Sequence, residues 1–157
     1  DLKTSGSILV AGKTRSGKTT GTITILLPLL LCGRDKYDSN IFIIDPKLAE
    51  LSMLPHVVAV NPNGDVEPVI ALMEEFESTR KTRQAVLNRR SQETGNAVKW
   101  WDAGMHPSIL FIDEYVALKS LFPKSARGNG GFNISDFESL LKRIITMGAS
   151  AGCFGAD

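Results

Sequence analysis

The sequence predicts an α/β fold with a mostly parallel sheet and helices on both faces, and three observations support this. Segments typical of strands and of helices alternate along the chain, which is the order of a parallel sheet. Residues 41–44 and 109–112 are apolar without interruption, as parallel strands buried on both faces are. A glycine-containing turn, residues 12–17, stands between a strand-like and a helix-like segment. We therefore expect residues 1–157 to form a single domain.

The composition is that of one soluble globular domain. Of the 157 residues, 43% are hydrophobic and 22% are charged, which argues against disorder and suffices for one core. The formal net charge of +1 means that a nucleic-acid site would have to be a local basic patch. Cys32 and Cys153 match no metal or disulfide spacing. We interpret both as small buried apolar residues in a reducing compartment.

The longest apolar run raises the question of a membrane span. Residues 23–32 supply about half of the ~20 apolar residues that a spanning helix needs, and Pro28 interrupts them. We interpret the run as a buried helix. No signal peptide is visible, because the polar stretch from Asp1 opens the chain. We expect a cytoplasmic piece of a longer protein, and whether that protein is attached to the cytoplasmic face of a membrane stays open.

The first part of the chain is expected to supply three strands and two helices. Residues 17–31 are apolar nearly all round, which indicates a helix that is covered on most sides and kinks or ends early at Pro28. A second helix follows Asp65, a candidate N-cap, with Pro68 in its first turn. The expected strands are residues 7–11, 41–44 and 57–60, the last at an edge of the sheet.

The helix after Asp65 has an apolar and a basic side. Its apolar residues recur at helical spacing: Val69, Leu72, Met73, Phe76, Val86 and Leu87. Its C-terminal half carries the basic residues Arg80, Lys81, Arg83, Arg89 and Arg90. Basic residues suit that end of the helix dipole, so we interpret them first as a solvated face and only second as a nucleic-acid contact.

The second half of the chain supplies one more strand and one more helix. Residues 91–107 are polar and contain Trp100 and Trp101, of which we expect one in the core and one as its cover, rather than two rings stacked on bases. A strand at residues 109–112 and a basic, glycine-rich loop at residues 124–133 follow.

The last helix is expected to start at a capping box. Ser135 is the candidate N-cap, and Glu138 stands three residues later. Gly148 marks the end of the helix. The apolar face between them consists of Leu140, Leu141, Ile144 and Ile145.

The segment GKTRSGKT, residues 12–19, matches G-x-x-x-x-G-K-[ST] at each fixed position. Gly12 and Gly17 allow a tight turn whose amides point at phosphate oxygens, and the following helix adds its positive dipole end. Lys18 would reach the β- and γ-phosphates, and the Thr19 hydroxyl would bind Mg²⁺, which prefers oxygen ligands. A glycine-rich turn in an unrelated α/β domain is the alternative. The predicted nucleotide site consists of Gly12, Lys13, Thr14, Arg15, Ser16, Gly17, Lys18, Thr19 and Thr20.

Two aspartates that follow apolar runs, Asp45 and Asp113, compete for the second metal position. A P-loop needs an acid at the end of another strand to hold the water shell of Mg²⁺. Glu114 follows Asp113 directly, and a neighbouring carboxylate can orient and deprotonate an attacking water. Pro46 after Asp45 offers no second acid. We therefore assign Asp113 to the metal and Glu114 to general base catalysis, with a helix N-cap as the structural alternative for this pair.

Two segments carry a family resemblance. IIDPKLAEL, residues 43–51, follows the P-loop strand and helix, and ILFIDEY, residues 109–115, follows the basic helix. This arrangement resembles the FtsK/SpoIIIE-type DNA-pumping ATPases, which belong with the conjugation coupling proteins and HerA-like motors. The resemblance implies a RecA-like P-loop fold, a homo-hexameric ring and ATP hydrolysis that drives movement along double-stranded DNA, in segregation or conjugative transfer.

The resemblance also implies roles for single residues. Lys18 and Glu114 take the family's catalytic positions, and Thr19 and Asp113 take those that hold Mg²⁺. Asp45 and Lys47 match the Asp-Pro-Lys of the family, which we place near the subunit boundary or the rim of the active site. For Asp45 the alternative is a cap on the turn that follows.

The chain departs from the family pattern in two places. Many relatives carry an arginine in the segment that here reads TMGASAG, where Ala149 stands instead, and Arg143 one turn earlier could face a neighbouring subunit. The family continues after AGCF into a strand with a polar sensor residue, whereas this chain ends at Asp157. We therefore expect the strand between the P-loop strand and the strand of Asp113 to be missing, which leaves ATP turnover by this chain alone an open question.

Other nucleotide-binding classes lack their signatures here. The sequence contains no Asn-Lys-x-Asp for guanine and no Leu-Ser-Gly-Gly-Gln of transport ATPases, and a kinase lid would be richer in arginine than KSARGNGG. The rival from another class is an assembly module in which nucleotide binding stabilises a protein–protein contact. We hypothesise that the loop with Lys124 and Arg127 and the basic helix face DNA. His56 and His106 are interpreted as surface or hydrogen-bonded residues, not metal ligands.

Overall fold

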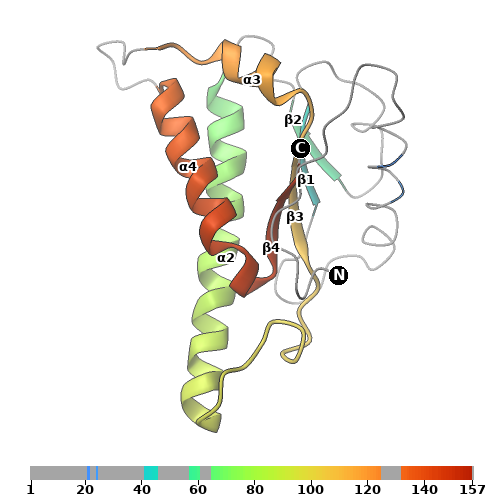
Figure 1. Ribbon diagram of the computed structural model, residues 1–157, viewed down its shortest axis with the longest axis vertical. Helices are drawn as coiled ribbons and strands as arrows, with labels where there is room; N and C mark the ends of the chain where they lie inside the picture. The colour runs from blue at the N-terminus through green and yellow to red at the C-terminus, as the bar shows by residue number, and fades with distance from the viewer. Residues whose placement is uncertain are drawn as a thin grey trace.

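The computed structural model describes residues 41–45, 57–60, 65–124 and 132–156, together with Gly21 and Thr24. Within these residues four strands form one sheet (Figure 1): β1 (Ile41–Ile44), β2 (Val57–Val60), β3 (Ser108–Ile112) and β4 (Cys153–Ala156). Their spatial order is β2–β1–β3–β4, and every pair is parallel. The predicted parallel sheet is confirmed. The predicted strand at residues 7–11 and all of the helix at 17–31 except Gly21 and Thr24 lie outside the described residues.

The two central strands are apolar because both of their faces are covered. All four residues of β1 and all five of β3 are buried. The strands pair in register from Ile41 opposite Ile109 to Ile44 opposite Ile112. Branched and aromatic side chains suit this position, since they fill the space on both faces of a parallel sheet.

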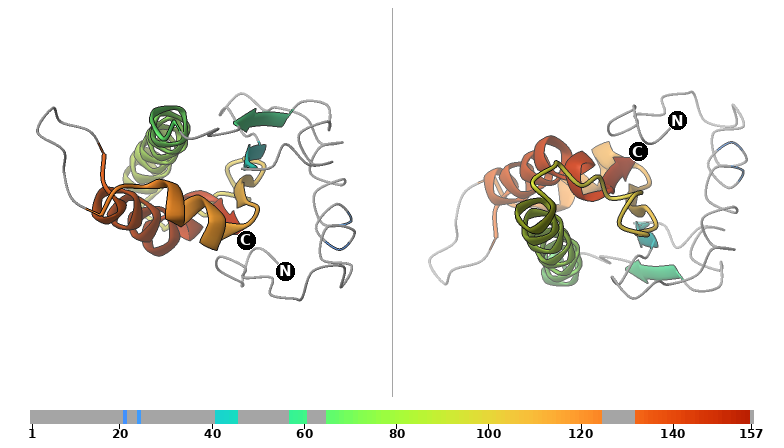
Figure 2. Two further views of the ribbon diagram at one scale, coloured as in Figure 1. Left: turned by 90° about the horizontal axis from the view of Figure 1, so that it is seen from above. Right: turned by 90° about the horizontal axis from the view of Figure 1, so that it is seen from below.

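In the part of the chain from residue 41 on that the structure describes, the α-helices beside the sheet are α2 (Glu67–Thr94), α3 (Tyr115–Leu121) and α4 (Ile134–Met147). Figures 1 and 2 show α2 and α4 side by side on one face of the sheet, with α3 across the top of α4 and α2 in the view of Figure 1. Helix α2 extends well below the lower ends of the strands in that view. No helix in the described part of the chain combines the length and apolar character needed to cross a bilayer.

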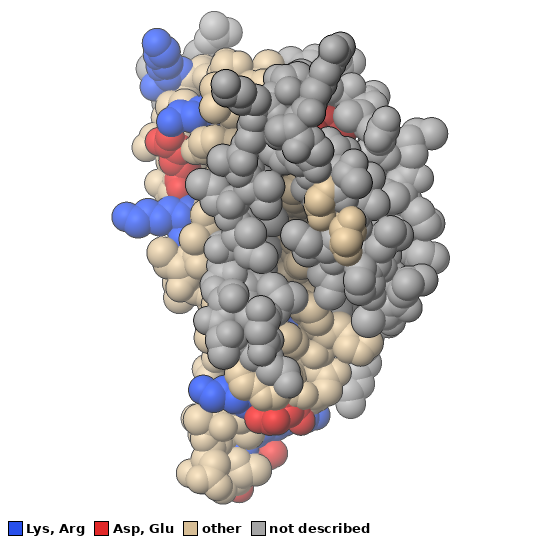
Figure 3. Space-filling view, turned by 45° about the vertical axis from the view of Figure 1, so that its right-hand side comes forward, with Lys and Arg blue, Asp and Glu red and all other residues tan. Residues whose placement is uncertain are grey.

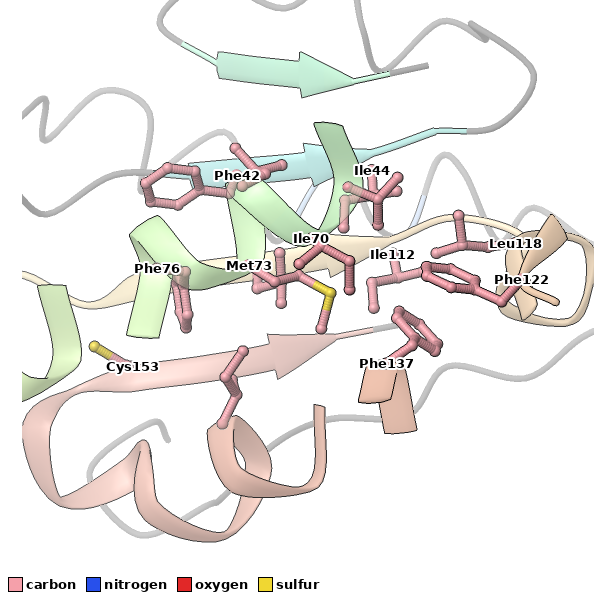
Figure 4. Packing of buried hydrophobic residues seen from close by; sticks show 14 of the residues in the cluster. Phe42, Ile44, Ile70, Met73, Phe76, Ile112, Leu118, Phe122, Phe137 and Cys153 are labelled. Carbon is pink, nitrogen blue, oxygen red and sulfur yellow. The ribbon is translucent and has the colours of Figure 1, made fainter. Parts of the chain in front are cut away.

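The main core lies between the sheet and the pair α2 and α4 (Figure 4). Phe76 of α2 meets Phe42 of β1 edge to face, with ring centroids 5.5 Å apart. Fully burying a side chain of this size contributes about 1.5–3 kcal/mol. A second cluster of buried residues uses the alternate side chains of the strands and the loop before β3: Ile41, Ile43, Leu87, Trp100, Ala103, Met105, Ile109 and Phe111.

The tryptophan pair is arranged as predicted. Trp100 is 6% exposed and belongs to the second cluster, whereas Trp101 is partly buried and packs against that cluster. The two rings meet edge to face at 5.3 Å. Trp100 is therefore core and Trp101 its cover.

Helix α2 is longer than the sequence pattern predicts. Its N-cap is Val66 rather than Asp65, but the Asp65 carboxylate accepts a hydrogen bond from the Glu67 amide at 3.1 Å and so still satisfies one amide of the first turn. The helix ends at Gly95, whose φ of 72° requires the left-handed region that favours glycine. Polar residues after position 90 thus extend the helix by a further turn.

The basic side of α2 is not uniformly solvated, which corrects the expectation for Arg80 and Arg83. Arg80 is 5% exposed, and its Nε and Nη2 donate to both carboxylate oxygens of Glu77 at 2.7 and 2.8 Å. These bonds raise the pKa of Arg80. Arg83 is 1% exposed, and its Nε donates to the Ala151 carbonyl at 2.7 Å and its Nη2 to the His106 carbonyl at 2.6 Å. Lys81 and Arg89 are exposed as predicted.

The capping box of α4 lies two residues before the predicted one. Asn133 is the N-cap, and its side chain accepts from the Asp136 amide at 2.9 Å while the Asp136 carboxylate accepts from the Asn133 amide at 2.9 Å. Asn caps as well as Ser, and Asp at the third helical position replaces the expected Glu138. Ser135 therefore lies inside the first turn.

Helix α4 leads into β4 through a turn that requires glycine. A Cβ atom on Gly148 would lie 2.2 Å from the Cys153 carbonyl oxygen, so no other residue fits. A short 3-10 helix, η2 (Ala149–Ala151), and Gly152 at φ 70° complete the turn. Strand β4 then pairs with β3, Ser108 opposite Cys153. Strand β4 pairs with the edge of β3 that faces away from β1 and satisfies its backbone groups. The P-loop strand lies outside the described residues, so the expected absence of a strand between it and β3 stays a prediction.

Candidate active site

The carboxyl ends of β1 and β3 bring Asp45 and Asp113 to neighbouring positions. Ile44 and Ile112 are the last register pair, and each is followed directly by an aspartate. The Asp113 amide donates to the Ile44 carbonyl at 2.9 Å, which continues the pairing by one step. Sites in parallel α/β sheets form at this edge, so both aspartates lie where chemistry is expected.

Burial separates the roles of the two aspartates. Asp45 is fully buried, with 0% exposure, whereas Asp113 and Glu114 are partly exposed. A metal ion with its water shell and a phosphate chain need access to solvent. Of the two aspartates, Asp113 is therefore the one that solvent can reach, and its assignment to the metal stays a prediction.

Glu114 has an unusual backbone conformation. Its φ of 55° and ψ of 54° lie in the left-handed region, and it is the only residue other than glycine with positive φ in the described part of the chain. This conformation costs a residue with a Cβ atom about 1–2 kcal/mol. Such conformations persist where the surrounding structure enforces them, often at functional sites.

Helix α3 enforces the turn at Glu114. Glu114 is its N-cap, and the Glu114 carbonyl accepts from the Leu118 amide at 3.0 Å. Leu118 is fully buried, and Phe122 stacks on Phe137 of α4 with centroids 4.6 Å apart. Tyr115 stacks on the same ring at 6.1 Å. The chain after Glu114 is therefore anchored in the main core, which fixes the direction in which Glu114 leaves the strand.

An exposed ion pair adds a second link between α3 and α4. The Lys119 ammonium contacts the Glu138 carboxylate, and this hydrogen bond raises the pKa of Lys119. Both side chains are substantially exposed, so the pair contributes little to stability. Seven residues are too few for a periodic pattern, so periodicity did not predict α3. The helix N-cap that was the structural alternative for Asp113 and Glu114 is present at Glu114.

The remaining predicted site residues are placed as follows. The whole P-loop set, residues 12–20, lies outside the described residues, as do Lys47, His56 and Arg127. Arg143 is exposed on α4, and Lys124 is exposed after α3. His106 is partly buried, and its carbonyl accepts from Arg83. The described residues contain no group of three or more His, Cys, Asp or Glu side chains that could hold a metal ion by themselves.

Cys153 is the buried apolar residue that the sequence predicts. It is fully buried at the start of β4, and burial raises the pKa of its thiol to about 11, against the opposing charges of Arg83 and Arg80. A thiol that stays protonated is a poor nucleophile and a poor metal ligand. We therefore assign no chemistry to it.

A magnesium–nucleotide complex suits the described part of the site. Asp113 offers carboxylate oxygens, which are the ligands that Mg²⁺ prefers, at an accessible edge of the sheet. Glu114 stands directly beside it on a fixed backbone.

The sequence model of the FtsK/SpoIIIE family matches residues 1–150, nearly the whole chain. The chain belongs to the FtsK/SpoIIIE family. A curated relative, the "Ftsk domain-containing protein YdcQ" of Bacillus subtilis (strain 168), is 27% identical over 151 residues, which are 94% of this chain and 28% of the relative.

The fold of the family chain is shared with a solved structure. The pCW3 conjugation coupling protein TcpA, in a monomer form with ATPγS, matches with a TM-score of 0.66 at 20% identity, over 99% of this chain and 44% of that one. The expected RecA-like P-loop fold is thus confirmed. The chain spans less than half the length of either protein.

Proposed function

We propose that this chain is the ATP-binding and ATP-hydrolysing part of an FtsK-like motor that moves double-stranded DNA, in segregation or conjugative transfer. The observation that carries the proposal is the acid pair at the carboxyl end of β3: an accessible Asp113 followed by Glu114 on an enforced backbone turn. Family membership and the likeness to a protein whose structure holds ATPγS support the choice of nucleotide.

Each residue has a separate task in this proposal. The amides of residues 12–17 and Lys18 would hold the phosphates, and Thr19 and Asp113 would hold Mg²⁺. When bound, Mg²⁺ supplies positive charge that neutralises the phosphate oxygens. The Glu114 carboxylate would accept a hydrogen bond from the attacking water and take its proton as the water oxygen bonds to the γ-phosphorus. The bond from that phosphorus to the β–γ bridging oxygen breaks in the same displacement, and ADP leaves with the electron pair.

DNA and a ring of identical subunits enter as further parts of the proposal, and the cytoplasm is the proposed location. Exposed Arg143 on α4 is available to a neighbouring subunit. In the view of Figure 3, the visible Lys and Arg side chains of the described residues lie near Asp and Glu side chains, so that view shows no continuous basic stripe among them. We therefore place the DNA contact at the loop with Lys124 and Arg127, and no longer at Arg80 or Arg83.

A second candidate is an assembly module in which ATP binding regulates a protein contact without DNA transport. Apolar side chains on the outer surface favour it: Val116 of α3 is 80% exposed, and Met147 and Ile145 of α4 are 51% and 44% exposed. A contiguous exposed apolar patch, unlike singly scattered side chains, marks a contact site, so the candidate requires these residues to act together. The assembly module requires no general base at position 114.

The two candidates differ in ATP turnover. We would measure ATP hydrolysis by the purified protein with and without duplex DNA, for the wild type, Glu114→Gln and the control Glu75→Gln, an exposed acid on α2. Loss of a general base lowers the rate by about 10²–10⁴-fold. The motor proposal predicts a DNA-stimulated rate that Glu114→Gln loses and Glu75→Gln keeps. ATP binding without turnover in the wild type would favour the assembly module, and absence of ATP binding would refute both.

A further inference from the structure

Asp45 is the part of the carboxyl edge that the proposed mechanism leaves unexplained. Its exposure is 0%, although it ends a strand at the edge where Asp113 is accessible. Transferring a carboxylate from water into a protein is unfavourable unless hydrogen bonds or positive charge stabilise it. An apolar residue at this position would complete β1 without the cost of desolvating a carboxylate. The presence of an acid here therefore requires an explanation.

The geometry couples Asp45 to Asp113. The two residues follow the last register pair of β1 and β3, and the Asp113 amide is hydrogen-bonded to the carbonyl of Ile44, directly before Asp45. Neighbouring strands lie about 4.8 Å apart, so the backbones of the two aspartates are about one strand spacing from each other. Solvent ions screen a buried charge much less than an exposed one. A negative charge on Asp45 would therefore act on a cation held by Asp113.

We propose that Asp45 is a positioning residue for the magnesium–nucleotide complex: its buried carboxylate strengthens the binding of Mg²⁺ at Asp113 without contacting the metal. The inference rests on the proposed function. A fixed negative charge close to the Asp113 carboxylate would lower the free energy of a divalent cation bound there. The competing explanation is that Asp45 only caps the turn after β1, which would affect folding and leave magnesium affinity unchanged.

The test substitutes Asp45→Asn, which keeps the size and shape of the side chain and removes its charge. In a titration with a fluorescent ATP analogue, we would determine the Mg²⁺ concentration at half-maximal binding, and the affinity of the analogue in EDTA. Losing a residue that supports a metal ligand weakens metal binding by about 10–100-fold. We expect a shift of that size in the Mg²⁺ midpoint, with binding in EDTA unchanged. The matched control is Asp102→Asn, an exposed acid in the loop before β3, which should not shift it.

Each possible outcome of this titration either supports or overturns the inference. A wild-type Mg²⁺ midpoint in folded Asp45→Asn would overturn this inference and leave the proposed function intact. Nucleotide binding by the wild type that does not respond to Mg²⁺ would overturn both. If circular dichroism shows that Asp45→Asn is unfolded, Asp45→Ser takes its place in the same titration. Unfolding of both variants would also count against the inference, because a structural role alone would then explain the buried acid.

Discussion

Replacing Arg83 by methionine should strongly destabilise the protein, although the residue lies on what the sequence presents as a solvated basic face. Methionine keeps the apolar stem and removes the guanidinium. The change eliminates the bonds of 2.7 Å to the Ala151 carbonyl and 2.6 Å to the His106 carbonyl. At 1% exposure there is almost no room for water to replace them.

The expected loss follows from these two contacts. A hydrogen bond from a charged donor contributes about 1.5–3 kcal/mol, and most of that is lost when the acceptor remains buried. Two such bonds give a decrease of about 3–5 kcal/mol in the free energy of unfolding. In a domain of this size each kcal/mol lowers Tm by about 2–4 °C, so a drop of about 6–20 °C is expected.

Urea denaturation followed by circular dichroism measures this difference. Arg89→Met is the matched control, since it removes the same charge from an exposed position of the same helix and should change stability by less than about 0.5 kcal/mol. Equal, small effects of the two substitutions would refute the view that Arg83 holds the two carbonyls.

Two further predictions concern α4 and β4. Asn133→Ala should lower the free energy of unfolding by about 1 kcal/mol in urea denaturation, whereas Ser135→Ala should change it by less than about 0.5 kcal/mol, because Asn133 and not Ser135 caps α4. The Cys153 thiol has a pKa of about 11 in the folded protein against an ordinary 9.0, so the folded state binds this proton more tightly. Its contribution to stability is complete below pH 9.0 and is lost as the pH rises toward 11, by about 2–3 kcal/mol, measured as urea denaturation at pH 8 and pH 11 against Cys153→Ala.

Two results would contradict the predictions for α4 and for Cys153. A larger loss for Ser135→Ala than for Asn133→Ala would place the start of α4 at the position that the sequence pattern suggests. An identical fall in stability between the two pH values for the wild type and Cys153→Ala would show that the thiol titrates normally in the folded state.

The two central strands, β1 and β3, were predictable because they are apolar without interruption, whereas β4 was not predicted as a strand. The apolar residues 41–44 and 109–112 indicate parallel strands buried on both faces. The aspartate that follows each run lies at the carboxyl edge of the sheet. The sequence also favours Asp113 over Asp45 for the metal, since only Asp113 has an acid as its neighbour, and the difference in burial is compatible with that prediction.

The contacts between distant segments were not predictable. Arg83 looks like its exposed neighbours in the sequence, and only the fold shows that its helix passes beside η2 and the loop before β3. Helical periodicity identifies which face of a helix is buried, but not the segment of the chain that packs against that face. Helix α3 is too short for any periodicity, so the conformation of Glu114 had no signal in the sequence.

The carbonyls of His106 and Ala151, which accept hydrogen bonds from Arg83, lie at equivalent positions just before the adjacent strands β3 and β4. His106 lies two residues before Ser108, Ala151 lies two residues before Cys153, and Ser108 and Cys153 are register partners. One rigid side chain thus clamps both strands at their amino ends, so β3 and β4 cannot slide along each other without breaking it. Replacing Arg83 would therefore loosen this end of the sheet, while the opposite end, where Glu114 stands, keeps its own contacts through α3.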